Sequence, residues 1–389
     1  MLYYCPLEEY KERYTCQWSA PITGWLERNW IKHNIPYVRI SSPYDKEKTK
    51  YIKTGTILDA QRRTDHCFSQ VSQLIKLAYK GKLTSSDIIY FDDFWHLGVE
   101  ALSYTLHQLN ISPKMFSFLH AQSVDIYDFT YPMRDWMRHF ERGIAKSMTG
   151  IFVNSQLLKK LLIDAKIGDK DKIHVIGHVF SEEEVKEHYQ KTVSPLLRTN
   201  NVVFSSRWDM EKNPSLFLLL LTYVVKLQER KDITFTICTS SPKLKSNDKN
   251  LMYLLNECLR KYPDNLFLLE NLSKEDYYNE LRMSKIQVNT ADQDWISIAL
   301  LEASMAGCYP LYPNFRSFPQ AFRYDKRFLY KRYQIDDLSK KVIEIIDGRH
   351  WSKKAIKDRA WIHERHNDSW GRMINIMFNK KIVKVRKYE

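Results

Sequence analysis

The sequence contains no uninterrupted apolar run of about 18 residues or more, which is the length that a helix needs to cross a bilayer. Residues 1–12 lack the basic segment and the apolar core of a secretory signal. We therefore expect a cytoplasmic protein that has no integral membrane segment. Low-complexity tracts and internal repeats are also lacking, so disorder is not expected to dominate.

Cysteine is sparse, and several catalytic motifs are missing. The six cysteines lie far apart without a C-x-x-C pair, which argues against a zinc ribbon and a disulfide framework. No G-x-S-x-G elbow and no P-loop occurs, and residues 363–366 lack the H-E-x-x-H spacing of a zinc protease. We expect the cysteines to be reduced thiols that pack in the cores.

Positive charge, in contrast, is abundant. The 389 residues include 60 Lys and Arg against 46 Asp and Glu, which gives a formal net charge of +14. Such a charge attracts partners rich in phosphate. Nucleic acid, an anionic membrane surface and a nucleotide donor all satisfy this condition, so the charge alone does not choose among them.

Short apolar runs alternate with segments of helical periodicity, a pattern typical of parallel sheets with crossover helices. In the first half we expect strands at 37–40, 88–91, 115–119, 151–153 and 173–176, and helices at 25–33, 68–80, 97–109 and 132–148. A polar stretch at 181–200 interrupts the pattern. It then resumes with strands at 202–205, 233–238, 266–269, 286–289 and 309–312, and helices at 214–228, 251–262, 274–283 and 296–306.

This alternation predicts an α/β protein of two doubly wound, Rossmann-like domains that face each other across a cleft. We assign residues 1–180 to an acceptor domain and 200–350 to a nucleotide-sugar domain. Residues 351–389 are expected to form helices and a basic tail that pack back on the first domain. Because ligands of doubly wound sheets bind beyond the carboxyl ends of the strands, residues that directly follow a strand are site candidates.

The most informative segment is 294–303, Asp-Trp-Ile-Ser-Ile-Ala-Leu-Leu-Glu-Ala, which follows an expected strand. Glu302 is the only ionisable residue between Trp295 and Gly307, and its helical neighbours are apolar. A carboxylate in such surroundings needs a partner, which a ribose diol or a structural ion pair would supply. Asp294 is either a helix N-cap or a ligand of sugar hydroxyls.

Arg207 and Lys212 bracket a loop that leads into a helix starting at Pro214. Cations beside a helix N-terminus are disfavoured unless an anion lies between them. A donor diphosphate would be such an anion. Local pairing with Asp209 and Glu211 is the alternative.

Asp292-Gln293-Asp294 also spells D-x-D, a pattern that can hold magnesium or manganese on a diphosphate. Because Arg207 and Lys212 already supply positive charge nearby, we expect no divalent metal to be required. No permanently bound cofactor is expected either.

These residues resemble the acidic pair of retaining GT-B glycosyltransferases related to family four, in which a carboxylate and a Glu are separated by seven residues, as Asp294 and Glu302 are. The continuation at 307–311, Gly-Cys-Tyr-Pro-Leu, is similar to the carboxyl domain of the tRNA-queuosine mannosyltransferase family. The resemblance includes the blocks 207–214 and 118–122 but is not continuous. Asp294 stands where the family usually has Glu, and Ser297 where it usually has Gly, so the donor sugar is not identified.

The resemblance implies a UDP- or GDP-sugar as co-substrate and retention of the anomeric configuration. It assigns the diphosphate to Arg207 and Lys212 and the ribose to Glu302. It assigns the donor sugar to Asp294 and His120. His120 follows an expected strand and could otherwise be a core or loop histidine. The remaining donor-binding candidates are Trp295, Ile296, Ser297 and Ile298.

Candidates for the acceptor site come from the first half. Asp92 and Asp93 follow the strand expected at 88–91, and aromatic residues follow them, which suits a sugar or a stacked base but equally a helix cap. Gln122 lies two residues after His120. The segment 19–24 occupies the place of the usual first glycine-rich loop, but Gly24 is its only glycine, so this signal for a loop is weak.

Basic and aromatic residues interleave at 323–333, and further cations occur at Arg62, Arg63 and in the tail at Lys380, Lys381, Lys384, Arg386 and Lys387. This favours nucleic-acid binding, with solvated lysine-rich faces as the alternative. The resemblance implies a modified nucleoside in tRNA as the acceptor. The compact build of the chain, in contrast, is similar to that of viral enzymes that glycosylate hydroxymethylated pyrimidines in DNA.

We favour a 5-hydroxymethylpyrimidine in phage DNA over tRNA as the acceptor. The rival functions are a peripheral-membrane transferase acting on lipid or polysaccharide, and an inactive GT-B-like scaffold that binds nucleic acid. The sequence does not indicate the oligomeric state.

Overall fold

The computed structural model describes residues 1–8, 14–43, 60–128, 130–180, 182–186, 194, 197–246, 248–348, 351 and 361–385. The chain forms two compact units. The first consists of Met1–Val179 together with Asp368–Tyr388, and the second of Phe180–Asn367.

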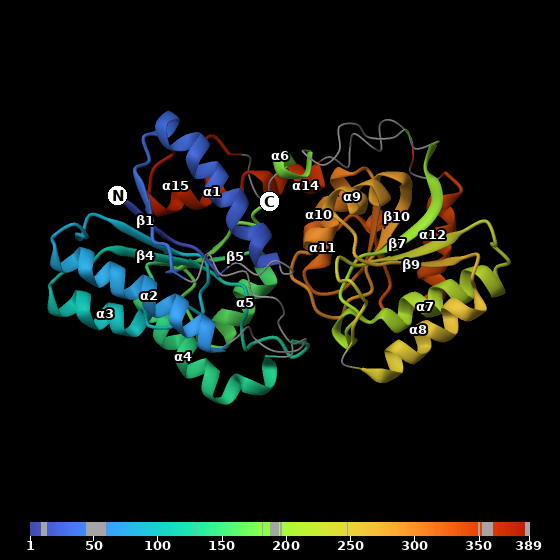
Figure 1. Ribbon diagram of the computed structural model, residues 1–389, viewed down its shortest axis with the longest axis horizontal. Helices are drawn as coiled ribbons and strands as arrows, with labels where there is room; N and C mark the ends of the chain where they lie inside the picture. Colours follow the sequence, from blue (N-terminus) through green and yellow to red (C-terminus); the bar gives the residue numbers. More distant parts are fainter. Residues whose placement is uncertain are drawn as a thin grey trace. The chain divides into compact units, whose positions relative to one another are not determined.

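The first unit contains a parallel sheet of six strands in the order β2-β1-β3-β4-β5-β6. The strands are β1 (Leu2–Cys5), β2 (Tyr37–Arg39), β3 (Ile88–Phe91), β4 (Lys114–Phe118), β5 (Gly150–Val153) and β6 (Ile173–Val175). The helices are α1 (Tyr14–His33), α2 (Ala60–Tyr79), α3 (Val99–Gln108), α4 (Arg134–Ser147), α5 (Gln156–Asp164) and α15 (Ser369–Met377), with a 3-10 turn at Tyr131–Met133. Helices α1 and α15 cover one face of the sheet, and α2, α3 and α4 the other (Figure 1).

Because both faces are covered, most residues of the inner strands are apolar, and every residue of β3 and β5 is buried. The C-terminal helix α15 belongs to this core, since Trp370 and Met373 pack with Tyr90. The Ser369 hydroxyl donates a hydrogen bond of 2.9 Å to the Ile176 carbonyl oxygen. Residues nearly 200 positions apart in the chain thus stabilise one unit.

The second unit contains another parallel sheet of six strands, in the order β12-β11-β10-β7-β8-β9. The strands are β7 (Thr199–Phe204), β8 (Thr234–Cys238), β9 (Leu266–Leu269), β10 (Ser284–Val288), β11 (Tyr309–Pro313) and β12 (Leu329–Tyr330). The helices are α6 (Glu182–Lys186), α7 (Pro214–Thr222), α8 (Lys249–Lys261), α9 (Lys274–Met283), α10 (Ile298–Met305), α11 (Phe318–Ala321), α12 (Ile335–Ile346) and α14 (Trp361–Asn367), and η5 (Tyr223–Leu227) extends α7 as a π-helix. The strand order reverses between β7 and β10, which is where doubly wound sheets bind ligands.

The predicted α/β class is therefore confirmed, but the start of the chain was interpreted wrongly. Strand β1 was not predicted, although it pairs with both β2 and β3. The segment 19–24, expected to be a glycine-rich loop, lies inside helix α1, so Gly24 is a helical residue whose added Cβ would meet the Arg28 side chain.

Gly307 ends the turn between α10 and β11 with φ +76°, and a Cβ there would lie 2.6 Å from Nη2 of Arg198. The Arg198 guanidinium is held by the carbonyl oxygens of Ala306 (2.8 Å) and Ser284 (3.0 Å), so it has little freedom to move. We expect Gly307→Ala to lower the free energy of unfolding by about 1–3 kcal/mol, measured by urea denaturation. Gly348 also has positive φ but has nothing within 4 Å of its Cβ position. An equal loss in Gly348→Ala would show that the contact with Arg198 adds nothing.

Candidate functional site

The loops that follow β7 and β10 emerge next to each other, because these two strands are paired neighbours in the sheet. Their backbones are joined by hydrogen bonds from the Asp292 amide to the Glu211 carbonyl oxygen (2.9 Å) and from the Thr290 hydroxyl to that of Lys212 (2.8 Å). Two segments that the sequence separates by about 80 residues thus form one structure at the strand-order reversal.

Oppositely charged side chains alternate across these two loops. Nζ of Lys212 donates to the Gln293 carbonyl oxygen (2.6 Å) and lies 3.6 Å from Oδ2 of Asp294 and 4.0 Å from Oε1 of Glu211. Arg207 pairs with Glu211 and, at 3.3 Å, with Asp209. The local pairing considered as an alternative is therefore present. Lys212 is buried, whereas the Arg207 side chain is half exposed.

Helix α10 begins immediately after these residues. Ser297 occupies its N-cap position without a side-chain capping hydrogen bond, so Asp294 is not the cap, and that alternative was wrong. Oδ1 of Asp294 accepts from the Trp295 amide instead (3.0 Å), and Oδ2 faces Lys212. The first amides of a helix have no partner inside it, and its dipole adds positive potential there.

Trp295, between Asp294 and this helix, is 6% exposed. Its indole Nε1 is buried and donates to no acceptor among the described residues. The Arg316 guanidinium lies 4.9 Å from the centre of its ring system. Because nearly all buried polar groups in proteins are hydrogen-bonded, this donor indicates a position where a polar partner fits.

Glu302 lies on α10 and is 5% exposed. Its Oε1 accepts hydrogen bonds from the Tyr278 hydroxyl (2.9 Å) and Nζ of Lys274 (3.2 Å), both on α9. Oε2 accepts no hydrogen bond from the described residues. The structural ion pair considered for Glu302 thus exists, and the second oxygen still leaves room for a ligand. The sequence predicted helix α9 but gave no signal that its first turn reaches Glu302.

The two carboxylates of the D-x-D pattern do not converge on one point. Asp292 pairs with Nη2 of Arg332 at 2.8 Å, whereas Asp294 faces Lys212. Within the part of the chain that the structure describes, no group of three His, Cys, Asp or Glu side chains is arranged to hold a metal ion.

In the first unit, His120 follows β4 after one further residue. Its Nε2 lies 2.8 Å from the Asp92 carbonyl oxygen, and its ring packs against Trp18 and Phe118. Burial lowers the pKa of His120 to about 3, so the imidazole is neutral at physiological pH. A neutral ring that donates from Nε2 presents Nδ1 as its acceptor nitrogen.

The acceptor candidates Asp92 and Asp93 are both occupied by protein partners. Asp92 is fully buried and accepts hydrogen bonds from the Tyr4 hydroxyl (2.5 Å) and the Trp18 indole (3.2 Å). Burial raises its pKa to about 6. Asp93 pairs with Arg63, which also binds Glu8 at 2.8 Å. Neither carboxylate caps a helix, and their acceptor role stays a prediction.

Three further expectations about partners need correction or refinement. Gln122 is fully buried and its Oε1 accepts from the amides of Val124 (2.6 Å) and Asp125 (2.8 Å), so it fixes the loop after β4. Arg62 and Arg63 are buried and do not form a surface for nucleic acid, contrary to our expectation. Within the segment 323–333, Phe328 and Tyr330 belong to the core, and only Tyr324 and Tyr333 are strongly exposed aromatics.

Replacing His120 should change how stability depends on pH. A folded pKa near 3 lies below the unfolded value of about 6.5, so the stability that His120 contributes is full above pH 6.5 and is lost as the pH falls. Between pH 7.5 and pH 5 the wild type should lose about 2 kcal/mol that His120→Asn does not lose, measured by urea denaturation. His107→Asn, at an exposed position on α3, is the control. Equal pH dependence in all three proteins would contradict the assignment.

Comparisons with known proteins find similar sequences and similar folds. Residues 186–361 match the model of the family described as Glycosyl transferases group 1. The chain is also similar to the tRNA-queuosine alpha-mannosyltransferase of Drosophila melanogaster, with 30% identity over 131 residues. That alignment covers 33% of this chain and only 32% of the length of the relative.

Several solved structures have the same fold. A glycosyltransferase from Rickettsia africae has a TM-score of 0.63 at 12% identity and covers 97% of both chains. Anabaena Alr3699/HepE, solved with UDP and glucose, has a TM-score of 0.59 at 11% identity and covers 97% of this chain and 98% of its own. TarM has a TM-score of 0.58 at 14% identity, and the match covers 80% of this chain but 58% of TarM.

The predicted GT-B type of fold is thereby confirmed, and the match of residues 186–361 to a glycosyltransferase family agrees with the prediction of an enzyme. Each helix among the described residues is too short or too polar to cross a lipid bilayer.

Proposed function

We propose that this chain, in which residues 186–361 match the Glycosyl transferases group 1 family, transfers a sugar with retention from a nucleotide sugar to a hydroxyl group of a modified nucleobase in nucleic acid. The observation that carries the proposal is the joining of Arg207, Lys212 and Asp294 at the strand-order reversal, directly before the helix that bears Glu302.

The donor occupies the second unit. Its diphosphate binds Arg207, Lys212 and the first amides of α10, replacing Glu211 as the partner of both cations. The ribose hydroxyls donate to Oε2 of Glu302, while Lys274 and Tyr278 hold Oε1. The donor also supplies the polar partner that the Trp295 indole lacks.

The chemistry needs little from the protein beyond positioning and charge neutralisation. Asp294 orients the hydroxyls of the donor sugar, and the donor-sugar role of His120, which belongs to the first unit, stays a prediction. The acceptor oxygen attacks the anomeric carbon from the face on which the bond to the diphosphate breaks. Its proton passes to the departing phosphate oxygen, so no carboxylate acts as a covalent nucleophile and the configuration is retained.

The acceptor is the least constrained part of the proposal. The net charge of +14 suits a polyanionic substrate. The sequence favours a 5-hydroxymethylpyrimidine in DNA, whereas the Drosophila relative favours a modified nucleoside in tRNA as the second candidate. Both present a hydroxyl on a base that must be flipped out or single-stranded to react.

Nucleoside mass spectrometry tests the proposal. The protein is incubated with UDP- and GDP-sugars and either tRNA or DNA that contains 5-hydroxymethylcytosine, with Glu302→Gln as the blank. A pentose or hexose mass gain on one nucleoside would identify donor and acceptor together. Donor hydrolysis without any gain would move the acceptor to lipid or glycan, and intact donor in every reaction would contradict a transferase.

A further inference from the structure

The first unit contains a concave surface that the reaction does not use. It is a groove of about 660 Å³ between the sheet and the C-terminal helix α15 with the residues that follow it. Phe116 and Met377 line it, and Lys114, Lys380 and Lys381 place three ammonium groups around it. Lys114 begins β4, whereas His120 follows the other end of that strand, about 16 Å away. The groove therefore lies at the edge of the sheet opposite to His120.

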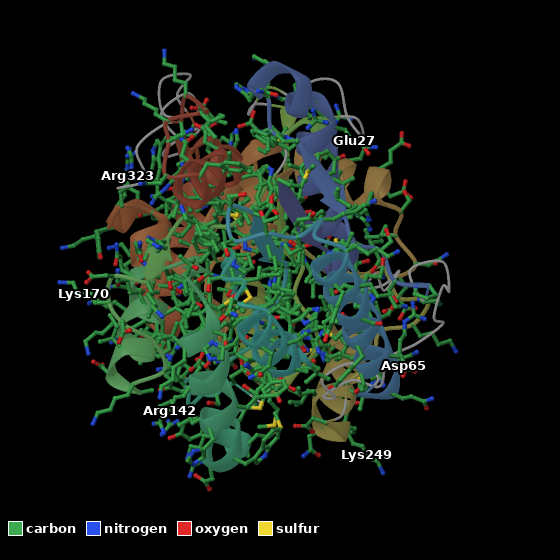
Figure 2. The ribbon with its side chains drawn as sticks, turned by 90° about the vertical axis from the view of Figure 1, so that its left-hand side faces the viewer. Glu27, Asp65, Arg142, Lys170, Lys249 and Arg323 are labelled. Atoms are coloured by element: carbon green, nitrogen blue, oxygen red, sulfur yellow. The ribbon has the colours of Figure 1, made fainter. Side chains whose placement is uncertain are left out.

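Among the described residues that line the groove, three are lysines and none is acidic, so their charge has one sign. Figure 2 shows Arg142 and Lys170 on one side of this unit and Glu27 and Asp65 on the other, and Arg142 donates a hydrogen bond of 3.0 Å to the Ala165 carbonyl oxygen. Lys170 lies in the turn that leads into β6, whose His174 lines the groove. A polyanion would thus meet favourable potential at the groove.

The start of the basic tail is held in place by hydrogen bonds, although its lysines are exposed. Asn375 on α15 accepts hydrogen bonds from the amides of Ile382 (2.8 Å) and Val383 (2.9 Å) and donates one to the Val383 carbonyl oxygen (2.8 Å). Gly371 gives the tail room, because a Cβ there would lie 2.8 Å from the Val385 side chain. Lys380 and Lys381 are therefore presented on an ordered turn, while Arg386 and Lys387 lie outside the described residues.

We infer that this groove binds the phosphate backbone of the nucleic acid that carries the acceptor base. This inference rests on the proposed function. The lysines act as point charges on phosphates, which contributes affinity without sequence information. Phe116 is 3% exposed and Met377 is fully buried, so neither offers an exposed surface on which a base could stack. Contact with the nucleic-acid backbone is therefore favoured. A recessed site suits an extended chain better than it suits a flat membrane surface.

The test uses the full chain and the triple variant Lys114→Gln, Lys380→Gln, Lys381→Gln. The matched control replaces Lys76, Lys80 and Lys82, three exposed lysines at and after the end of α2, and removes the same charge. Fluorescence anisotropy with a labelled single-stranded DNA and a tRNA transcript is measured between about 50 and 300 mM KCl, a range over which the Debye length falls about 2.4-fold. Thermal melting verifies that both variants fold.

Three lost phosphate contacts should weaken binding on the order of a hundredfold near 0.1 M salt and reduce the slope of log K against log salt by about 2–3. The control should keep most of the affinity and slope. In the nucleoside assay, KM for nucleic acid should rise in the triple variant while kcat is unchanged. Equal losses in both variants, or no loss in either, would overturn the inference.

The remaining outcomes separate this inference from the proposed function. Sugar transfer to a nucleoside with an unchanged KM in the triple variant would overturn the inference and leave the function intact. Groove-dependent binding of nucleic acid without any sugar transfer would support the inference and remove the acceptor from the proposed function. Flotation with anionic phosphatidylserine vesicles, combined with no binding of nucleic acid, would overturn the inference in favour of a membrane surface.

Discussion

Replacing Glu302 with glutamine should lower kcat/KM for the nucleotide sugar by about a hundredfold or more, because two hydrogen bonds to a charged acceptor are weakened. The amide keeps one oxygen for Tyr278 and Lys274, and the side chain keeps its volume in a position that is 5% exposed. The fold should therefore survive. Steady-state kinetics with the donor varied, together with calorimetric titration of UDP, measures the effect.

Two further variants separate a ligand role from the ion pair with Lys274. If Glu302 only balances the charge of Lys274, then Lys274→Gln should reduce kcat/KM as strongly as Glu302→Gln does. If Oε2 binds ribose, Lys274→Gln should cost much less, because the Lys274 side chain is 37% exposed and the Tyr278 bond to Oε1 remains. Glu275→Gln, at an exposed position on α9, controls for the loss of a carboxylate. Unchanged activity in Glu302→Gln would contradict the assignment.

Periodicity predicted most of the fold because most of the parallel strands contain a short run of apolar residues, and polar turns precede and follow these runs. It failed at β1, where Leu2–Cys5 is equally short and apolar but was considered only as part of a possible signal segment. The consequence was local. Without β1 as the first strand, Gly24 was placed in a strand-to-helix loop, whereas the structure places it well inside α1.

The candidate site was predictable to the extent that its residues follow strands. Arg207 and Asp294 follow β7 and β10, and the sequence order of a doubly wound sheet brings those ends together. Side-chain partners were not predictable, because they depend on packing between distant segments. Lys274 reaches Glu302 from another helix, and Tyr4 and Trp18 enclose Asp92 from β1 and α1.

Charge patterning was the least reliable signal. Arg62 and Arg63 are adjacent cations on α2, and adjacency suggested a solvated surface, yet both are buried. Arg63 is compensated by Glu8 and Asp93, which lie 55 and 30 residues away in the sequence. In the tail the opposite applies, since Lys380 and Lys381 line a groove. Only tertiary structure distinguishes a buried, paired cation from one that is available to a polyanion.

Replacing Arg207 with glutamine should lower kcat by about a hundredfold or more, because the guanidinium neutralises charge that develops on the leaving diphosphate. Stability should change by less than about 1 kcal/mol, since Arg207 is half exposed and its pairs are with its own loop. Arg230→Gln is the matched control, because Arg230 also pairs with two carboxylates, Asp232 and Asp347, but follows the end of the α7 and η5 helical segment. Comparable kcat losses in both variants would contradict the role of Arg207.

Replacing Glu211, the partner of Arg207, gives the sharper test, because this change should strengthen UDP binding instead of weakening it. Glu211 contacts Arg207 and lies 4.0 Å from Lys212, so it competes with the donor diphosphate for both cations. Glu211→Gln removes this competitor and should tighten UDP binding about three- to tenfold, as the gain of roughly 1 kcal/mol from one freed charge contact implies. If the ion pairs only shape the loop, Glu211→Gln and Arg207→Gln would both weaken UDP binding, because each would disorder the same turn.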